Sequence, residues 1–119
     1  MALPQSARLN LTEVDGYLIV NLPEVITDPI LETHYQRISE LVETTRYRGV
    51  ILNIAAVSML DHGSLQHIRR ICRANTLLGS STVIAGANAS IAAYLASLPD
   101  SNTDLTFCQD METARAACG

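Results

Sequence analysis

One stretch in the middle of the chain, MLDHGSLQHIRRICR from Met59 to Arg73, holds residue types that could do chemistry. Asp61, His62 and Ser64 are the types found in a hydrolytic triad. Residues this close together at the start of a helix project in different directions, so they cannot form the proton relay that a triad needs. The stretch therefore predicts a displayed helix without catalytic residues, and we expect no enzymatic activity.

Metal and cofactor chemistry find no support in the sequence. The three histidines, His34, His62 and His67, offer no pair at i, i+4 spacing and no third ligand. The turn from Gly86 to Ser90 could bring backbone amides to a phosphate, but it lacks a Lys and any glycine-rich phosphate motif. We therefore expect no metal and no cofactor, and we interpret this turn as a connection between a strand and a helix.

The cysteines and the net charge indicate the cellular compartment and exclude some classes of binding partner. Cys72, Cys108 and Cys118 are odd in number and widely spaced, which predicts reduced thiols and no zinc site. The formal net charge is −4, with eight Arg and no Lys, so the chain has no footprint for nucleic-acid binding. No apolar run approaches the roughly 18 residues that a spanning helix needs. We expect a cytoplasmic protein that neither binds nucleic acid nor inserts into a membrane.

The elements that would position the helix start with a β-hairpin. Leu9 to Val14 and Tyr17 to Leu22 are β-friendly segments joined by Asp15-Gly16, the pair that a type I′ turn favours. Thr27 precedes an Asp-Pro pair and a helical apolar pattern that runs to about Thr45. The apolar run from Val50 to Ile54 is typical of a central strand buried on both faces.

The second half alternates helices and strands. Asp61 is placed to cap the next helix by accepting the backbone N–H of Ser64, and Gly79 ends that helix. The pattern then predicts a strand over Thr82–Ala85, a helix over Ile91–Leu98, a strand over Leu105–Cys108 and a helix over Asp110–Ala117. The predicted order is ββαβαβαβα around a mixed sheet, an α/β fold in a single domain over residues 9–118, with residues 1–8 as a flexible N-terminal segment.

The polar residues of the Asp61 helix admit two interpretations. Asp61 serves either as a plain helix cap or as a cap that also marks a functional surface, and both can hold together. His62, Gln66, Arg69 and Arg73 follow one helical row at spacings of four, three and four. Such a row is a solvated face or a surface that meets an acidic partner.

The predicted order and several phrases of the sequence resemble the STAS domains of anti-sigma-factor antagonists. The phrases are YLIVNLPEVITD, GVILNIAAVSMLD, LLGSSTVIAGANASIAAYL and the acidic start of the final helix. The resemblance runs from about Leu9 to Ala117, and its most specific part is the strand, loop and capped helix from Val50 to Ile71. Within the family, the chain is most similar to the scaffold branch of the bacterial stressosome.

The resemblance implies a regulatory site at the start of the helix. In the family, the residue after the capping Asp is a Ser or Thr that a partner kinase phosphorylates, and here that position is His62. Phosphate control is then absent or moved to Ser64 or Ser58. The regulatory region implied is Asp61, His62, Gly63, Ser64 and Ser58, and the docking residues are Met59, Leu60, Gln66, Arg69 and Arg73.

The partners implied by the resemblance are a switch-protein serine/threonine kinase of the anti-sigma-factor type and related STAS scaffold proteins, in a homo- or hetero-oligomer. The alternative is an accessory subunit of an ABC-type membrane transporter, which would dock an ATP-binding subunit through the same helix. The neighbouring reading frames would discriminate these two functions.

Overall fold

The computed structural model describes residues 10–98 and 105–118 of the chain. The expected flexible segment of residues 1–8 lies outside this described part. The chain begins with β1 (Asn10–Val14) and β2 (Tyr17–Asn21). Asp15 and Gly16 between them both have positive φ, 53° and 85°, as a type I′ turn requires, so the predicted hairpin is confirmed. A Cβ on Gly16 would meet only the exposed Arg48 side chain, which can shift, so the positive φ is what favours glycine here.

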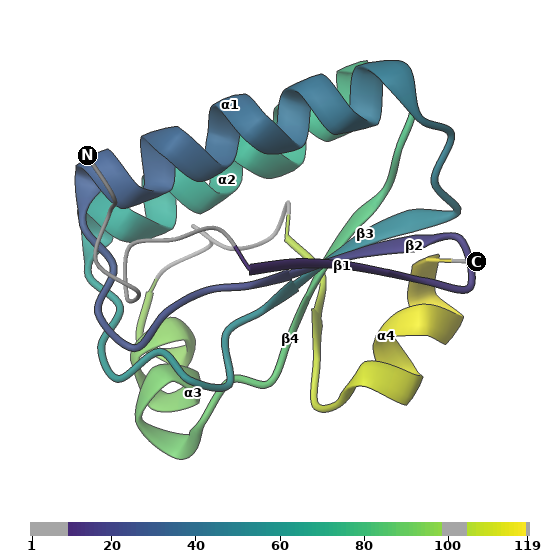
Figure 1. Ribbon diagram of the computed structural model, residues 1–119. Coiled ribbons are helices and arrows are strands. Elements are labelled where there is room, and N and C mark those ends of the chain that lie inside the picture. The colour runs from purple at the N-terminus through teal and green to yellow at the C-terminus, as the bar shows by residue number, and fades with distance from the viewer. Residues whose placement is uncertain (1–9, 99–104, 119) are drawn as a thin grey trace.

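The remaining elements alternate as the sequence predicts. They are α1 (Asp28–Thr44), β3 (Gly49–Asn53), α2 (His62–Leu77), β4 (Thr82–Ala85), α3 (Ala89–Ala96), β5 (Phe107–Cys108) and α4 (Met111–Cys118). The strands form one sheet in the order β1-β2-β3-β4-β5, with β1 antiparallel to β2 and the other neighbours parallel. Figure 1 shows α1 and α2 on one face of the sheet and α4 on the other, with α3 beyond the ends of the strands. The buried residues of α3, Ile91 and Leu95, belong to the same core cluster as those of α1 and α2.

Some predicted boundaries are wrong by a few residues, for local reasons. α3 begins at Ala89 instead of Ile91, because the Asn88 side chain caps it by accepting the backbone N–H of Ile91 at 2.8 Å. β5 is confined to Phe107–Cys108, the two residues in register with β4. Asp110 precedes the last helix as its cap, since its carboxylate accepts the backbone N–H of Thr113 at 2.8 Å.

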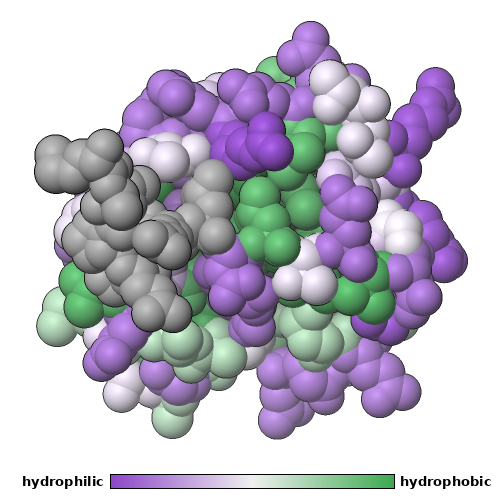
Figure 2. Space-filling view, in the orientation of Figure 1, coloured by the Kyte–Doolittle hydropathy of each residue, from purple (hydrophilic) through white to green (hydrophobic). Residues whose placement is uncertain are grey.

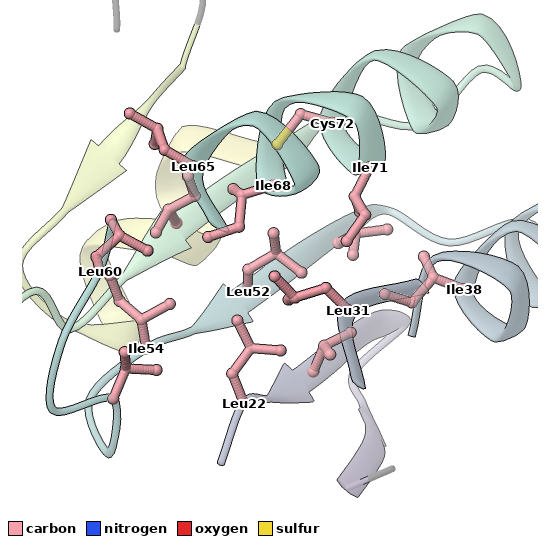
Figure 3. Packing of buried hydrophobic residues seen from close by; sticks show 14 of the residues in the cluster. Leu22, Leu31, Ile38, Leu52, Ile54, Leu60, Leu65, Ile68, Ile71 and Cys72 are labelled. Atoms are coloured by element: carbon pink, nitrogen blue, oxygen red, sulfur yellow. The ribbon is translucent and has the colours of Figure 1, made fainter. Parts of the chain in front are cut away.

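The core lies on both faces of β3, as the apolar run predicted. Val50, Ile51 and Leu52 have no exposed surface. On the α1/α2 face, Ile68 and Ile71 of α2 point toward Leu52 (Figure 3). On the other face, Ile51 packs in a smaller cluster with residues of β2, β4 and α4, namely Tyr17, Ile19, Val83, Ala85 and Ala114. Full burial of each such aliphatic side chain stabilises the fold by about 1.5–3 kcal/mol.

A histidine lies inside this apolar packing. His34 of α1 is fully buried, and its Nδ1 is 2.8 Å from the carbonyl oxygen of Ile30, so Nδ1–H donates to that carbonyl. Nε2 has no hydrogen-bond partner among the described residues. Burial lowers the pKa of His34 below its ordinary value, and the hydrogen bond to Ile30 only partly opposes this. The folded protein therefore holds His34 neutral.

We expect this histidine to make stability depend on pH. The unfolded chain takes up a proton near pH 6.5, whereas folded His34 does so only at lower pH, so the free energy of unfolding falls as the pH drops from 7 to 5. Chemical unfolding of the wild type and of His34→Gln at pH 7 and pH 5 measures this. The loss between the two pH values should be smaller in His34→Gln, and equal losses in both proteins would contradict the assignment.

Candidate functional site

The candidate site is the exposed start of α2, which follows β3 through the loop from Ile54 to Leu60. Asp61 has extended backbone angles, and its Oδ1 accepts the backbone N–H of Ser64 at 2.7 Å, while its carbonyl accepts the N–H of Leu65 at 3.0 Å. These bonds satisfy backbone donors that a helix start otherwise leaves unpaired. The predicted cap is confirmed, and α2 begins at His62.

The Asp61 carboxylate remains ionised to low pH. The backbone N–H of Ser64 is the main cause that lowers the pKa of Asp61, followed by the Ser64 hydroxyl, and the charge of His62 adds to the effect. Desolvation opposes the shift but does not overcome it. The helix dipole also favours a negative charge at this end. The site thus carries a fixed anion at the base of an exposed helix tip.

The two residues that follow the cap are exposed, and the third is not. His62 and Gly63 both lie on the surface. A Cβ on Gly63 would meet only the Asp61 carboxylate, at 3.6 Å, so the position is open toward solvent. Ser64 is only 5% exposed, with its hydroxyl directed to Asp61. Of the two hydroxyls near His62, Ser58 and Ser64, the Ser64 hydroxyl is the one that the Asp61 cap shields.

Ser58 lies before the cap and is exposed. Its backbone N–H and its hydroxyl both donate to the carbonyl oxygen of Glu24, at 3.0 and 3.1 Å. These bonds bring the loop after β2 against the loop after β3. The Ser58 hydroxyl therefore lies at the surface. Its side-chain hydrogen bond goes to the backbone carbonyl of Glu24, which is also exposed.

Apolar side chains are exposed beside this hydroxyl. Met59 is 75% exposed, and Val25, next to Glu24 in the neighbouring loop, is 59% exposed. Met59 also lines a groove of about 380 Å³ with Ser58, Leu60, Ser90, Ile91 and Tyr94. The Asn88 amide donates to the Val57 carbonyl at 3.3 Å, so α3 is tied to this loop. Exposed apolar residues beside a shallow groove are typical of a protein-binding surface.

The remaining predicted docking residues divide between surface and interior. Gln66 and Arg73 are exposed. Leu60 and Arg69 are buried, at 6% and 9% exposure, so the expectation that Arg69 continues one solvated row is wrong. Leu60 is part of the core below the loop, because its side chain is the last apolar anchor before the helix begins. For Arg69, the helical spacing alone did not reveal that neighbouring structure covers that side of α2.

Sequence reasoning missed the residues that attach α2 to α1. Arg70 Nη1 lies 2.8 Å from Glu32 Oε2, and its guanidinium stacks 4.0 Å from the centre of the Tyr35 ring. His67 Nε2 lies 3.4 Å from Asp28 Oδ1. No local signal in the sequence pairs these residues, since Arg70 and Glu32 are 38 positions apart. Val25 and Tyr94 were also missed, because they reach the site from other segments.

Between residues 10–98 and 105–118, no group of three or more His, Cys, Asp or Glu side chains converges to hold a metal ion. None of the helices in the same ranges combines the length and the apolar character needed to cross a membrane.

Comparisons with known proteins agree on one fold. A family model described as the STAS domain matches residues 8–111. No curated protein matches the sequence. Among solved structures, a Ser-to-Glu variant of RsbS from Moorella thermoacetica gives a TM-score of 0.76 at 18% identity, covering 93% of this chain and 94% of that one.

Two further solved structures show the same fold. One is a chain in a structure of the stressosome, which is described as a signal integration and transduction hub. It gives a TM-score of 0.76 at 17% identity and covers 92% of this chain and 95% of that chain. The anti-sigma-factor antagonist SpoIIAA in its unphosphorylated form gives 0.66 at 13% identity, with 92% and 96% covered. At these identities the likeness shows a shared fold.

The cap leads to a prediction about stability. Asp61→Ala removes the acceptor for the Ser64 N–H, and we expect Tm to fall by about 4 °C, whereas Asp61→Asn keeps an acceptor and should lose much less. The advantage of the wild type over Asp61→Asn should shrink as the pH falls from 7 toward the lowered pKa of Asp61, because protonation removes the charge but leaves an acceptor oxygen. Thermal unfolding of the three proteins at pH 7 and pH 3 tests this. Equal losses for Ala and Asn at pH 7 would contradict a capping role.

Proposed function

Because the chain belongs to the STAS domain family, we propose that it is a non-enzymatic protein-interaction domain of sigma-factor or stress signalling. It binds a switch-protein serine/threonine kinase of the anti-sigma-factor type, and it co-assembles with related STAS proteins in an RsbS-like role. The observation that carries the proposal is the exposed start of α2, where Asp61 fixes the helix tip beside exposed Met59 and Val25.

The exposed start of α2 suits a partner whose binding depends on the charge at the helix tip. A phosphate or carboxylate placed at the helix tip would add negative charge beside Asp61, which the helix dipole tolerates. A docked partner surface would not tolerate the same charge. An acidic surface would repel the added charge, and an apolar surface would remove water from it without supplying a partner. The fold can thus remain intact while binding is lost, which is the physical basis of a partner switch.

We place any phosphate control on Ser58. His62 occupies the position directly after the cap and has no hydroxyl. Ser64 is buried and directed to Asp61, so a kinase would have to open the first turn of α2 to reach it. Ser58 is exposed, next to Met59, and needs only to release its side-chain bond to the Glu24 carbonyl. Accessibility therefore favours Ser58 over Ser64.

The docking surface is tested by a charge at the helix tip. We expect His62→Asp to weaken binding to the anti-sigma-factor-type kinase encoded nearest to its gene by about tenfold or more, as a loss of 1.4 kcal/mol or more in binding free energy would produce. His62→Gln, polar and uncharged, should bind like the wild type. Titration calorimetry gives the affinities, and circular dichroism confirms that both variants fold. Unchanged affinity of His62→Asp would rule out this helix start as the docking surface.

The phosphate acceptor is tested with the same kinase and ATP. We expect one phosphate on the wild type and on Ser64→Ala, and none on Ser58→Ala, by intact mass and phosphopeptide mapping. A phosphopeptide that retains its label at Ser64 in Ser58→Ala would contradict the assignment. A wild type without any label would make the domain a static scaffold, whose kinase binding the His62 variants still measure.

A further inference from the structure

β1 is an edge strand of the sheet. β1 pairs along all five of its residues with β2, and it stands at the end of the sheet. Its other side faces no strand within the described ranges 10–98 and 105–118. The opposite edge, β5, has only two residues. The fold thus presents one edge long enough to pair with another strand.

The hairpin geometry settles which backbone groups face outward. In a two-residue hairpin the flanking residues, here Val14 and Tyr17, exchange hydrogen bonds, and hydrogen-bonded pairs then alternate along the ladder. The even-numbered residues of β2 and its flanks bond toward β3, as the bond from Leu22 N–H to the Asn53 carbonyl shows. On β1 it follows that Thr12 bonds to β2, whereas Leu11 and Glu13 direct their N–H and C=O groups to the open edge.

β1 lacks the devices that usually block an edge. Its sequence NLTEV contains no Pro, Gly or Lys, and its register with β2 runs without a bulge. Its one charged side chain, Glu13, is bound by the Tyr47 hydroxyl at 2.7 Å. The charge is therefore held against its own subunit, and it is not free to repel an incoming strand.

We propose that two copies of this chain pair through β1, antiparallel, about a two-fold axis that passes beside Thr12. In this register Leu11 of each copy lies opposite Glu13 of the other, and their outward N–H and C=O groups form four hydrogen bonds. The two Glu13 carboxylates are diagonal neighbours in this register and not directly opposite each other, and each is held by the Tyr47 hydroxyl of its own copy. The two five-stranded sheets become one continuous sheet.

The side chains agree with this pairing on both faces. Leu11 lies on the α1/α2 face and is only partly buried, as is Leu41 of α1, and both pack against the core. Figure 2 shows hydrophobic residues gathered at the centre of this side, between α1 and the edge strand of Figure 1. The second copy's Leu11 would extend this apolar surface. On the other face the two exposed Thr12 side chains meet, a pair that stabilises antiparallel strands.

The pairing deepens the co-assembly part of the proposed function, on which it rests, and leaves the docking site open. The docking site lies beyond the carboxyl end of β3, whereas β1 is a sheet edge two strands away. Both copies would keep an exposed α2 start in the dimer. Kinase binding and self-association are therefore separable measurements.

The first test removes one outward N–H. Glu13→Pro deletes that donor on an edge strand that tolerates proline, and Glu13→Ala is its matched control, since both lose the bond to Tyr47. In sedimentation velocity, we expect concentration-dependent dimers for the wild type and Glu13→Ala, and monomers for Glu13→Pro with kinase binding retained. A wild type that stays monomeric up to about 1 mM, or a Glu13→Pro dimer of unchanged affinity, would overturn the proposal.

The second test remains decisive if Glu13→Pro does not fold. A non-hydrogen-bonded antiparallel pair places its Cα atoms about 4.5 Å apart, within disulfide reach, so Thr12→Cys should form a symmetric disulfide dimer under mild oxidation. Asn10→Cys is the control, because the two copies of residue 10 would lie roughly 14 Å apart along the strands. The wild type gives the background from its native cysteines. Equal cross-linking at both positions would overturn the pairing. Dimers that form only in a protein lacking residues 1–8 would also overturn it, since those residues would then occupy the edge in the full chain.

Discussion

The burial of β3 on both faces, over Gly49 to Leu52, is the constraint on which the rest of the structure depends. A strand buried on both faces needs hydrogen-bonding neighbours on both sides and apolar layers above and below. β2 and β4 supply the parallel neighbours, and α1, α2 and α4 supply the layers. The direction of β3 then places its exit, and so the start of α2, at one end of the sheet. The packing of the core around β3 therefore determines where the candidate site lies.

Loops at that end are joined by backbone groups. The Ile54 N–H bonds to the Ala85 carbonyl at 2.9 Å, and Ser58 bonds to Glu24. Gly86 has φ of 88°, and a Cβ there would lie 3.0 Å from the Cβ of Ala55, so glycine permits the loop after β4 to approach the loop after β3. Three loops thus present their residues as one surface. A helix tip held in this way can change its charge without changing its position, which is what a partner switch requires.

The start of α2 and the β1 edge lie on different parts of the sheet, since β1 is two strands away from β3. The proposed docking residues lie beyond the strand ends, while the β1 edge runs alongside the strands and offers backbone groups that β2 leaves free. A domain built in this way can hold a neighbour at its edge and a changing partner at its end. Polar contacts between α1 and α2, above all those of Arg70 with Glu32 and Tyr35, hold α2 against α1 without contributing to either proposed surface.

The sequence by itself determined the order of elements, the type I′ turn at Asp15-Gly16, the cap at Asp61 and the burial of β3, because each depends on residues near one another in the chain. Only the tertiary structure decided that Arg69 and Ser64 are buried and that Val25 and Tyr94 reach the site. A helical repeat gives the direction of a side chain but not what stands opposite it. Contacts between segments distant in sequence depend on how the layers pack, and no local pattern encodes them.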